Sequence, residues 1–135
     1  MGRSPMADYR TALGRARGLG SAKHGVGHFI GQRVSAVALV FLICWGFSQA
    51  PALFQDGYDG TRAWLAQPLD AVLAILLIAT GFYHGQLGFR TIIEDYIGRR
   101  STRTILLILN TFVWIVGASL AAICLLKVAL GVGAG

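Results

Sequence analysis

The chain has 135 residues, of which 55% are hydrophobic and only 13% charged, with a formal net charge of +6. Because soluble domains carry roughly a quarter charged residues, this composition excludes an ordinary soluble globular protein. The positive charge does not indicate nucleic-acid binding, because the basic residues flank long apolar runs.

The N-terminal part of the chain differs from the rest. Residues 1–22 are rich in glycine, serine and arginine with few large apolar side chains, so we expect a mobile basic tail. An arginine-rich, acid-poor segment has features of a mitochondrial transit peptide, but its glycines disfavour an amphipathic targeting helix. Residues 23–135 form the second predicted unit, a membrane domain. His24 and His28 lie at its entry, where we expect only a polar interfacial role.

Apolar runs long enough to cross a bilayer as helices follow. The predicted spans are residues 34–54, 69–96 and 104–130. The first helix is expected to end near Pro51, since proline blocks helix continuation. Residues 55–68 are predicted to form a loop, with Gly57 as a breaker. The second helix is expected to start after Pro68 and to end near Tyr96.

The arginines predict the orientation of these spans. They gather before the first span and between the second and third spans, at Arg99, Arg100 and Arg103. The positive-inside rule therefore places the N-terminus and this second connection in the cytoplasm, and the C-terminus outside. Anionic lipid headgroups are sufficient to attract the basic tail. The predicted fold class is an all-α integral membrane protein with three transmembrane helices.

The third span is expected to have a structural role. It carries a face of small residues that lets another helix approach closely, formed by Gly117, Ala118, Ala121 and Ala122. Asn110 is placed to form a hydrogen bond across helices.

His84 is the most informative residue of the second span. At about 1.5 Å per residue it lies roughly 14 Å from Ile93 and about 22 Å from Leu69. That depth is the middle of a hydrocarbon layer about 30 Å thick, where a polar ring needs a partner. An imidazole there can ligate haem iron, relay a proton or form a hydrogen bond to a neighbouring helix.

Two glycines flank this histidine on one helix face. Gly81 and Gly88 lie one turn before and one turn after His84, which leaves room for a flat group such as a haem macrocycle. A second helix packed against small residues would explain the same glycines. A six-coordinate haem needs two axial ligands, and His24 and His28 lie too near the interface to be the second. A haem site would therefore need a histidine from a partner chain or from a second copy of this chain.

Further polar residues lie at the predicted cytoplasmic surface. Asp95 lies eleven residues after His84, only about 20° around the helix, and Tyr96 follows it. A carboxylate and a phenol at this position can form hydrogen bonds to a quinone carbonyl and help to supply protons. The alternative is an ordinary interface pair, with Arg99 or the next arginine neutralising the acid. Arg33 could pair with a haem propionate or anchor the helix among lipid headgroups.

The order of these features resembles a known family. The segment HGVGHFIGQRVSAVAL precedes the first span, a histidine is followed eleven positions later by Asp-Tyr, and a third span follows. Over about residues 23–130 the chain resembles the small hydrophobic membrane-anchor subunit, D type, of succinate dehydrogenase (complex II).

The resemblance implies a set of roles. His84 would be an axial ligand of haem b, the other coming from the larger cytochrome b-type anchor subunit. Tyr96 would form a hydrogen bond to a ubiquinone carbonyl with support from Asp95, and Arg33 would lie near the haem propionates. The flavoprotein and iron–sulfur subunits would dock on the cytoplasmic side, so that electrons from succinate reach quinone there.

This chain would then be a non-catalytic subunit of a respiratory enzyme, without catalytic residues of its own. The expected location is a bacterial inner membrane, with the mitochondrial inner membrane as the alternative. Two other interpretations remain open: a small structural or assembly protein without haem, and the anchor of a fumarate reductase. A proton or ion conductor is disfavoured, because His84 is the one ionisable group in the membrane interior.

Overall fold

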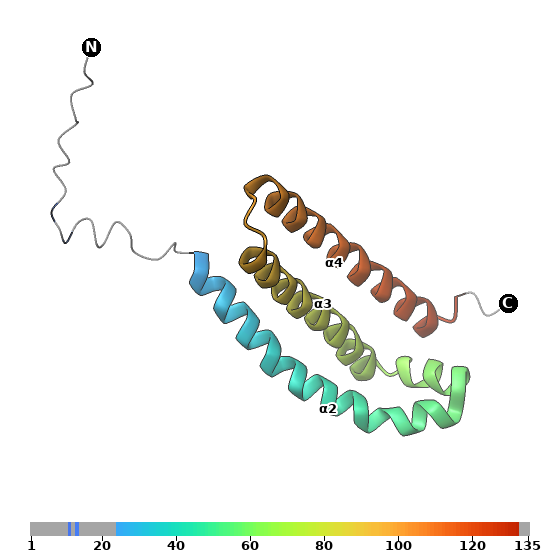
Figure 1. The fold of residues 1–135 in the computed structure, drawn as a ribbon. Helices are drawn as coiled ribbons and strands as arrows, with labels where there is room; N and C mark the ends of the chain where they lie inside the picture. The colour runs from blue at the N-terminus through green and yellow to red at the C-terminus, as the bar shows by residue number, and fades with distance from the viewer. Residues whose placement is uncertain (1–10, 12, 14–23, 133–135) are drawn as a thin grey trace, which may run out of the picture.

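The computed structural model describes residues 11, 13 and 24–132, and Figure 1 shows them as long helices joined by short links. The elements are α2 (His24–Leu65), α3 (Pro68–Tyr96) and α4 (Arg100–Ala129). The described residues contain no strand, so the predicted all-α class is confirmed. The predicted tail, residues 1–22, lies outside the described residues except for Thr11 and Leu13.

The three predicted membrane spans are confirmed. The helices long and apolar enough to cross a membrane are Val26–Pro51, Pro68–Tyr96 and Arg100–Ala129. The first begins before the predicted residue 34, because the helix continues through Gln32 and Arg33. Long polar side chains such as these extend toward an interface while their stems lie on apolar surface.

The prediction of a loop over residues 55–68 is wrong. Helix α2 continues through Pro51 to Leu65 and changes direction at Gly57, which has φ 60° and ψ −142°. Only glycine adopts such a conformation at little cost, so the chain bends there and remains helical on both sides. The last turns fold back toward the earlier part of α2 (Figure 1), where the Trp64 ring stacks on Trp45 with centroids 5.5 Å apart. Pro51 does not end the helix, because in membrane helices neighbouring groups can bond to the carbonyl that the proline leaves without a backbone N–H.

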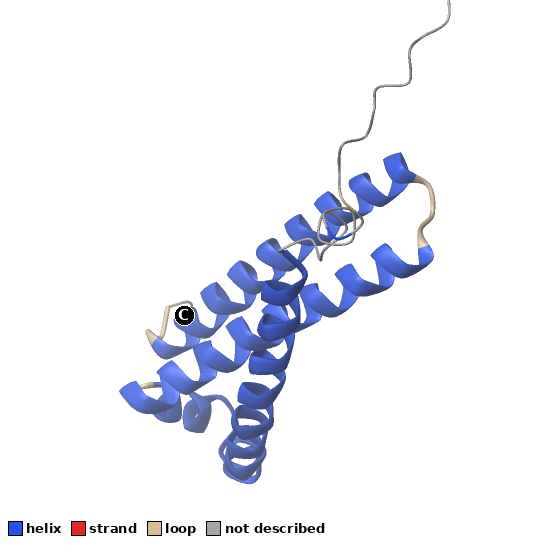
Figure 2. Cartoon of the chain, turned by 90° about the vertical axis from the view of Figure 1, so that its left-hand side faces the viewer, coloured by secondary structure: helices blue, strands red, loops and turns tan. Residues whose placement is uncertain are grey.

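Helix α3 lies between α2 and α4, as Figure 1 shows. It begins at Pro68, whose missing N–H costs nothing in the first turn, and ends at Tyr96, as predicted. The end of α3 and the start of α4 lie together at one end of the bundle in both views (Figures 1 and 2), and Figure 1 shows the start of α2 on the same side. Residues at the end of α3 and at the start of α4 therefore lie near one another at that end of the bundle.

The contact between α3 and α4 depends on glycines. A Cβ added to Gly85 would overlap the Trp114 ring, and one added to Gly117 would lie 2.6 Å from Phe82 Cε1. The Phe82 and Trp114 rings meet edge to face, with centroids 5.6 Å apart. The predicted close approach through the small face of the third span is therefore present at Gly117.

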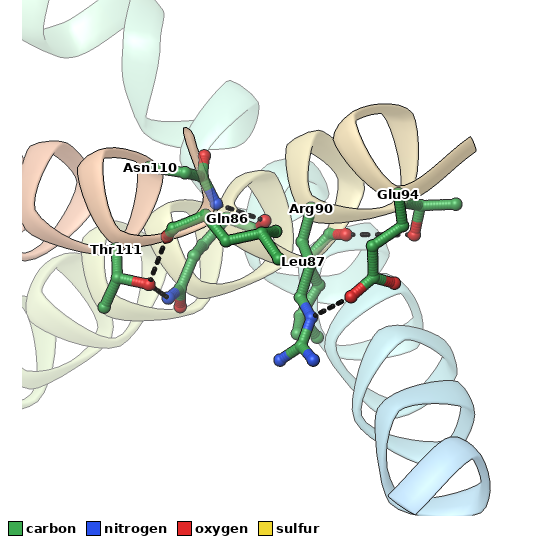
Figure 3. A network of polar contacts seen from close by, with 8 residues as sticks. Gln86, Leu87, Arg90, Glu94, Asn110 and Thr111 are labelled. Carbon is green, nitrogen blue, oxygen red and sulfur yellow. Dashed lines mark hydrogen bonds and ion pairs between the residues drawn. The ribbon is translucent and has the colours of Figure 1, made fainter. Parts of the chain in front are cut away.

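Buried polar groups add to the same contact. Asn110, which is only 9% exposed, donates from Nδ2 to the Gln86 carbonyl of α3 at 3.2 Å (Figure 3). Its Oδ1 accepts a hydrogen bond from Trp114 Nε1 at 2.8 Å. The predicted hydrogen bond of Asn110 across helices is confirmed.

Candidate functional site

His84 is half-buried in α3 and contacts α2 through one ring nitrogen. Its Nδ1 lies 2.9 Å from Ser35 Oγ, and Ser35 is only 4% exposed. The same hydroxyl donates to the Gln32 carbonyl one turn earlier, at 3.1 Å. The alternative role predicted for His84, a hydrogen bond to a neighbouring helix, is thus present, but it uses Nδ1 alone.

The other ring nitrogen remains accessible. Nε2 of His84 has no hydrogen-bond partner within residues 24–132, and it is not enclosed. A neutral imidazole has one nitrogen with a lone pair, which can ligate a metal or accept a proton. The geometry therefore leaves His84 able to bind a group that approaches the outside of the helix pair.

A pocket of about 250 Å³ lies beside this histidine. It is lined by Phe29, Gln32, Arg33, Ala36 and His84. The four α2 residues are spaced three and four apart, so they share one helix face. The Arg33 guanidinium lies 5.2 Å from the centre of the Phe29 ring, within the range of a cation–π contact. The structure therefore brings the two predicted residues Arg33 and His84 to one pocket.

The glycines around His84 fall into two classes. A Cβ at Gly88 would meet nothing within 4 Å, and one at Gly81 would only touch Leu39 Cδ2, at 3.9 Å. At Gly85, which was not predicted from the sequence, the Trp114 indole of α4 occupies the space that a Cβ would need. A neighbouring helix therefore explains Gly85, whereas Gly81 and Gly88 keep the open space expected beside a flat ligand.

Asp95 and Tyr96 form a separate group in the last turn of α3. Both are exposed, Tyr96 to 82%, and neither forms a hydrogen bond or ion pair with another described residue. The ion pair of this region is Arg90 with Glu94, at 2.9 Å (Figure 3). Tyr96 lies about 18 Å from His84 along the helix. The structure therefore separates the predicted quinone-binding residues from the predicted haem-binding residues.

The remaining histidines add one observation. The imidazole Nε2 of His28 is buried and has no hydrogen-bond partner among the described residues. The side chain of His24 is not among those described. In that part, no group of three or more His, Cys, Asp or Glu side chains could hold a metal ion. A single imidazole suits one axial position of a shared prosthetic group better than a site of several protein ligands.

Sequence reasoning missed Ser35. A serine in a membrane helix usually forms a hydrogen bond to a carbonyl of its own helix, so one serine among apolar residues carries no signal of its own. Residues two apart on a helix do not share a face, so the neighbouring candidate Arg33 gave no indication of Ser35. The contact with His84 depends on the register between α2 and α3.

Comparison with known proteins identifies the family. Residues 7–130 match the family model described as "Succinate dehydrogenase/Fumarate reductase transmembrane subunit". The succinate dehydrogenase hydrophobic membrane anchor subunit of Rickettsia bellii is 31% identical over 101 residues, which cover 75% of this chain and 81% of the relative. The subunit of the same name from Paracoccus denitrificans is 29% identical over 123 residues, 91% of this chain and 95% of the relative.

No solved structure gives a significant match to the chain. The family model covers almost the whole chain, including the three helices that carry the features described above. The chain therefore belongs to the succinate dehydrogenase/fumarate reductase transmembrane-subunit family, as a hydrophobic membrane-anchor subunit of succinate dehydrogenase.

Proposed function

We propose that this membrane anchor binds haem b through His84 and contributes Tyr96 and Asp95 to a ubiquinone site. The observation that carries the haem part is the state of His84. Its Nδ1 is engaged by Ser35, its Nε2 is accessible, and Arg33 lines the same pocket. A Cβ would meet nothing within 4 Å at Gly88 and only Leu39 Cδ2, at 3.9 Å, at Gly81, so little of the chain fills the space beside these two glycines.

Each of these side chains has a stated task. His84 would hold the haem through Nε2, and Arg33 would pair with a carboxylate of the bound group. Gly81 and Gly88 keep the helix surface low enough for a flat ring to approach. Bound haem would supply one-electron redox capacity inside the membrane. The larger, cytochrome b-type anchor subunit would supply the other ligand of the haem.

The quinone part rests on the exposed end of α3. The Tyr96 phenol donates a hydrogen bond to a quinone carbonyl, which polarises that carbonyl for reduction. Reduction to a quinol takes up two protons, and Asp95 lies where it can pass protons from the aqueous side. Both groups are free of protein partners within the described part of the chain, so a ligand need not displace an existing bond.

The same end of the bundle is the proposed docking side. The arginines there, Arg99 and Arg100, predict a cytoplasmic orientation, and the flavoprotein and iron–sulfur subunits dock on that face. Electrons from succinate then arrive next to Tyr96. The chain itself is a non-catalytic, multi-pass subunit in a bacterial inner membrane.

The haem assignment is tested by optical difference spectra of the affinity-tagged complex purified from its own membranes. We expect a b-type α-band after reduction with dithionite and partial reduction with succinate. His84→Leu keeps the bulk of the side chain and removes both ring nitrogens, so the band should disappear. A band that persists in His84→Leu would contradict the haem assignment and favour a structural role for the histidine.

The quinone assignment is tested separately with Tyr96→Phe. Loss of one hydrogen bond to a reacting carbonyl should lower succinate–quinone activity sharply while the haem band remains. Tyr58→Phe is the matched control, because Tyr58 is also an exposed tyrosine but lies in α2, and this variant should leave activity unchanged. Equal activity in the two variants would exclude Tyr96 from the quinone site. Comparison of succinate oxidation with fumarate reduction by a quinol distinguishes the fumarate reductase alternative.

A further inference from the structure

We propose that Ser35 is a positioning residue for His84: it accepts the Nδ1–H hydrogen bond and thereby fixes the tautomer whose Nε2 can ligate iron. This inference rests on the proposed haem function and extends it to a residue that the sequence did not indicate. The contact joins α2 to α3, with Ser35 Oγ 2.9 Å from His84 Nδ1.

The number of protons on the two side chains limits how Ser35 and His84 can bond. The serine hydroxyl has one proton, and two acceptors lie within reach: the Gln32 carbonyl at 3.1 Å and His84 Nδ1 at 2.9 Å. When the proton goes to the carbonyl, Oγ must accept from Nδ1–H, and Nε2 keeps its lone pair. When the proton goes to Nδ1, the single ring proton moves to Nε2, which then cannot bind a metal.

The carbonyl bond favours the first arrangement. Gln32 and Ser35 are one turn apart in α2, so this bond exists independently of how α3 packs. Ser35 is 4% exposed, so water has little access to replace either bond. Helix α2 thus presents an acceptor to α3, and the histidine is prepared for iron before the haem arrives.

The same bond should tune the ligand. An acceptor on the far ring nitrogen raises the basicity of a ligating imidazole and holds the ring plane. A more basic ligand stabilises the ferric over the ferrous state. Because the serine acceptor is neutral, it does so more weakly than a carboxylate would.

The test uses the whole purified complex with Ser35→Ala. Haem transfer to apomyoglobin should become faster by about 10-fold to 100-fold, the usual effect of removing such a partner. At a fixed potential the ferrous-to-ferric ratio should rise by about threefold to tenfold, which raises the midpoint potential by roughly 30 to 60 mV. The g-values of the ferric haem should shift, since the ring is free to rotate.

Matched variants separate positioning from packing. Ser35→Thr keeps the hydroxyl and Ser35→Val has the same bulk without it, so only the threonine variant should retain the wild-type potential and g-values. Ser48→Ala is a further control. The Ser48 hydroxyl bonds only within α2, to the Trp45 carbonyl and the Gln49 side chain, so its loss should leave the potential and g-values unchanged. Equal potentials in the threonine and valine variants would overturn the proposal, whatever the alanine variant does.

Different outcomes test the haem function of His84 and the positioning role of Ser35. If His84→Leu retains the haem band, the haem function itself is wrong. If His84→Leu loses the band while threonine and valine at position 35 behave alike, the haem function stands and the role of Ser35 is refuted.

Discussion

Asn110 provides a quantitative test of how α3 and α4 are held together. It is 9% exposed and forms two side-chain hydrogen bonds, to the Gln86 carbonyl across the helix pair and from Trp114 Nε1 (Figure 3 shows the first). Asn110→Leu removes both bonds while keeping a side chain of comparable size. The change in stability of this variant therefore measures the contribution of the hydrogen bonds rather than that of side-chain packing.

The magnitude follows from measured bonds in membrane proteins. Side-chain hydrogen bonds between membrane helices contribute about 0.6 kcal/mol on average and about 1.7 kcal/mol at most. Loss of the bond to Gln86 between the helices and of the bond to Trp114 within α4 should therefore destabilise the fold by about 1 to 3 kcal/mol. A double-mutant cycle with Trp114→Phe, which removes the indole N–H, isolates the bond within α4, and its coupling energy should be of similar size, about 0.6 kcal/mol and not above about 1.7 kcal/mol.

The assay is titration of the purified anchor in mixed micelles with sodium dodecyl sulfate, followed by far-ultraviolet circular dichroism. Thr104→Val is the control in the same helix, because Thr104 is exposed and its hydroxyl bonds to the Arg100 carbonyl one turn earlier in α4. Its effect should stay within about 0.5 kcal/mol. A stability of Asn110→Leu equal to that of this control, or a coupling energy of zero, would refute the reasoning.

Three further predictions concern packing and orientation. Gly85→Ala should lower stability, because overlap with the Trp114 ring costs about 1 to 3 kcal/mol and outweighs the helix propensity gained. Gly27→Ala is the control, because a Cβ there meets nothing within 4 Å, and it should show no loss of stability in the same titration. Trp64→Phe should leave stability unchanged or higher. The variant keeps a ring stacked on Trp45 and removes a buried Nε1 that has no hydrogen-bond partner among the described residues. A clear loss of stability would mean that this N–H is bonded. Ser101→Cys, without the native cysteines, should react with an impermeant maleimide in inside-out vesicles only, and labelling of right-side-out vesicles would reverse the orientation.

The main features of the fold could be predicted because they depend on local composition. A run of about 20 apolar residues must cross the membrane as a helix, since no water is present to satisfy its backbone. The end of α3 at Tyr96 was also predicted correctly, because helix stop signals are local features of the sequence. The bend of α2 was missed because Gly57 signals a break without saying whether the chain leaves the helix or continues it in a new direction.

The candidate site was predictable to a smaller extent. His84 was evident from depth alone, because a polar ring in hydrocarbon is costly. Helix periodicity placed Gly81, His84 and Gly88 on one face, but it could not tell which glycines a neighbouring helix fills. Gly85 rather than its neighbours receives the indole of α4, and that depends on how the two helices are rotated against each other.

By itself the sequence determined that this is a membrane protein with three spans, a histidine at mid-depth and an Asp-Tyr pair at one surface. These properties follow from hydrophobicity and helix geometry along a single segment. Only the tertiary structure decided that Ser35 of α2 reaches Nδ1 of His84 and that Arg33 lines the same pocket. Such contacts depend on the register between helices, which is set by side-chain packing across residues far apart in the chain.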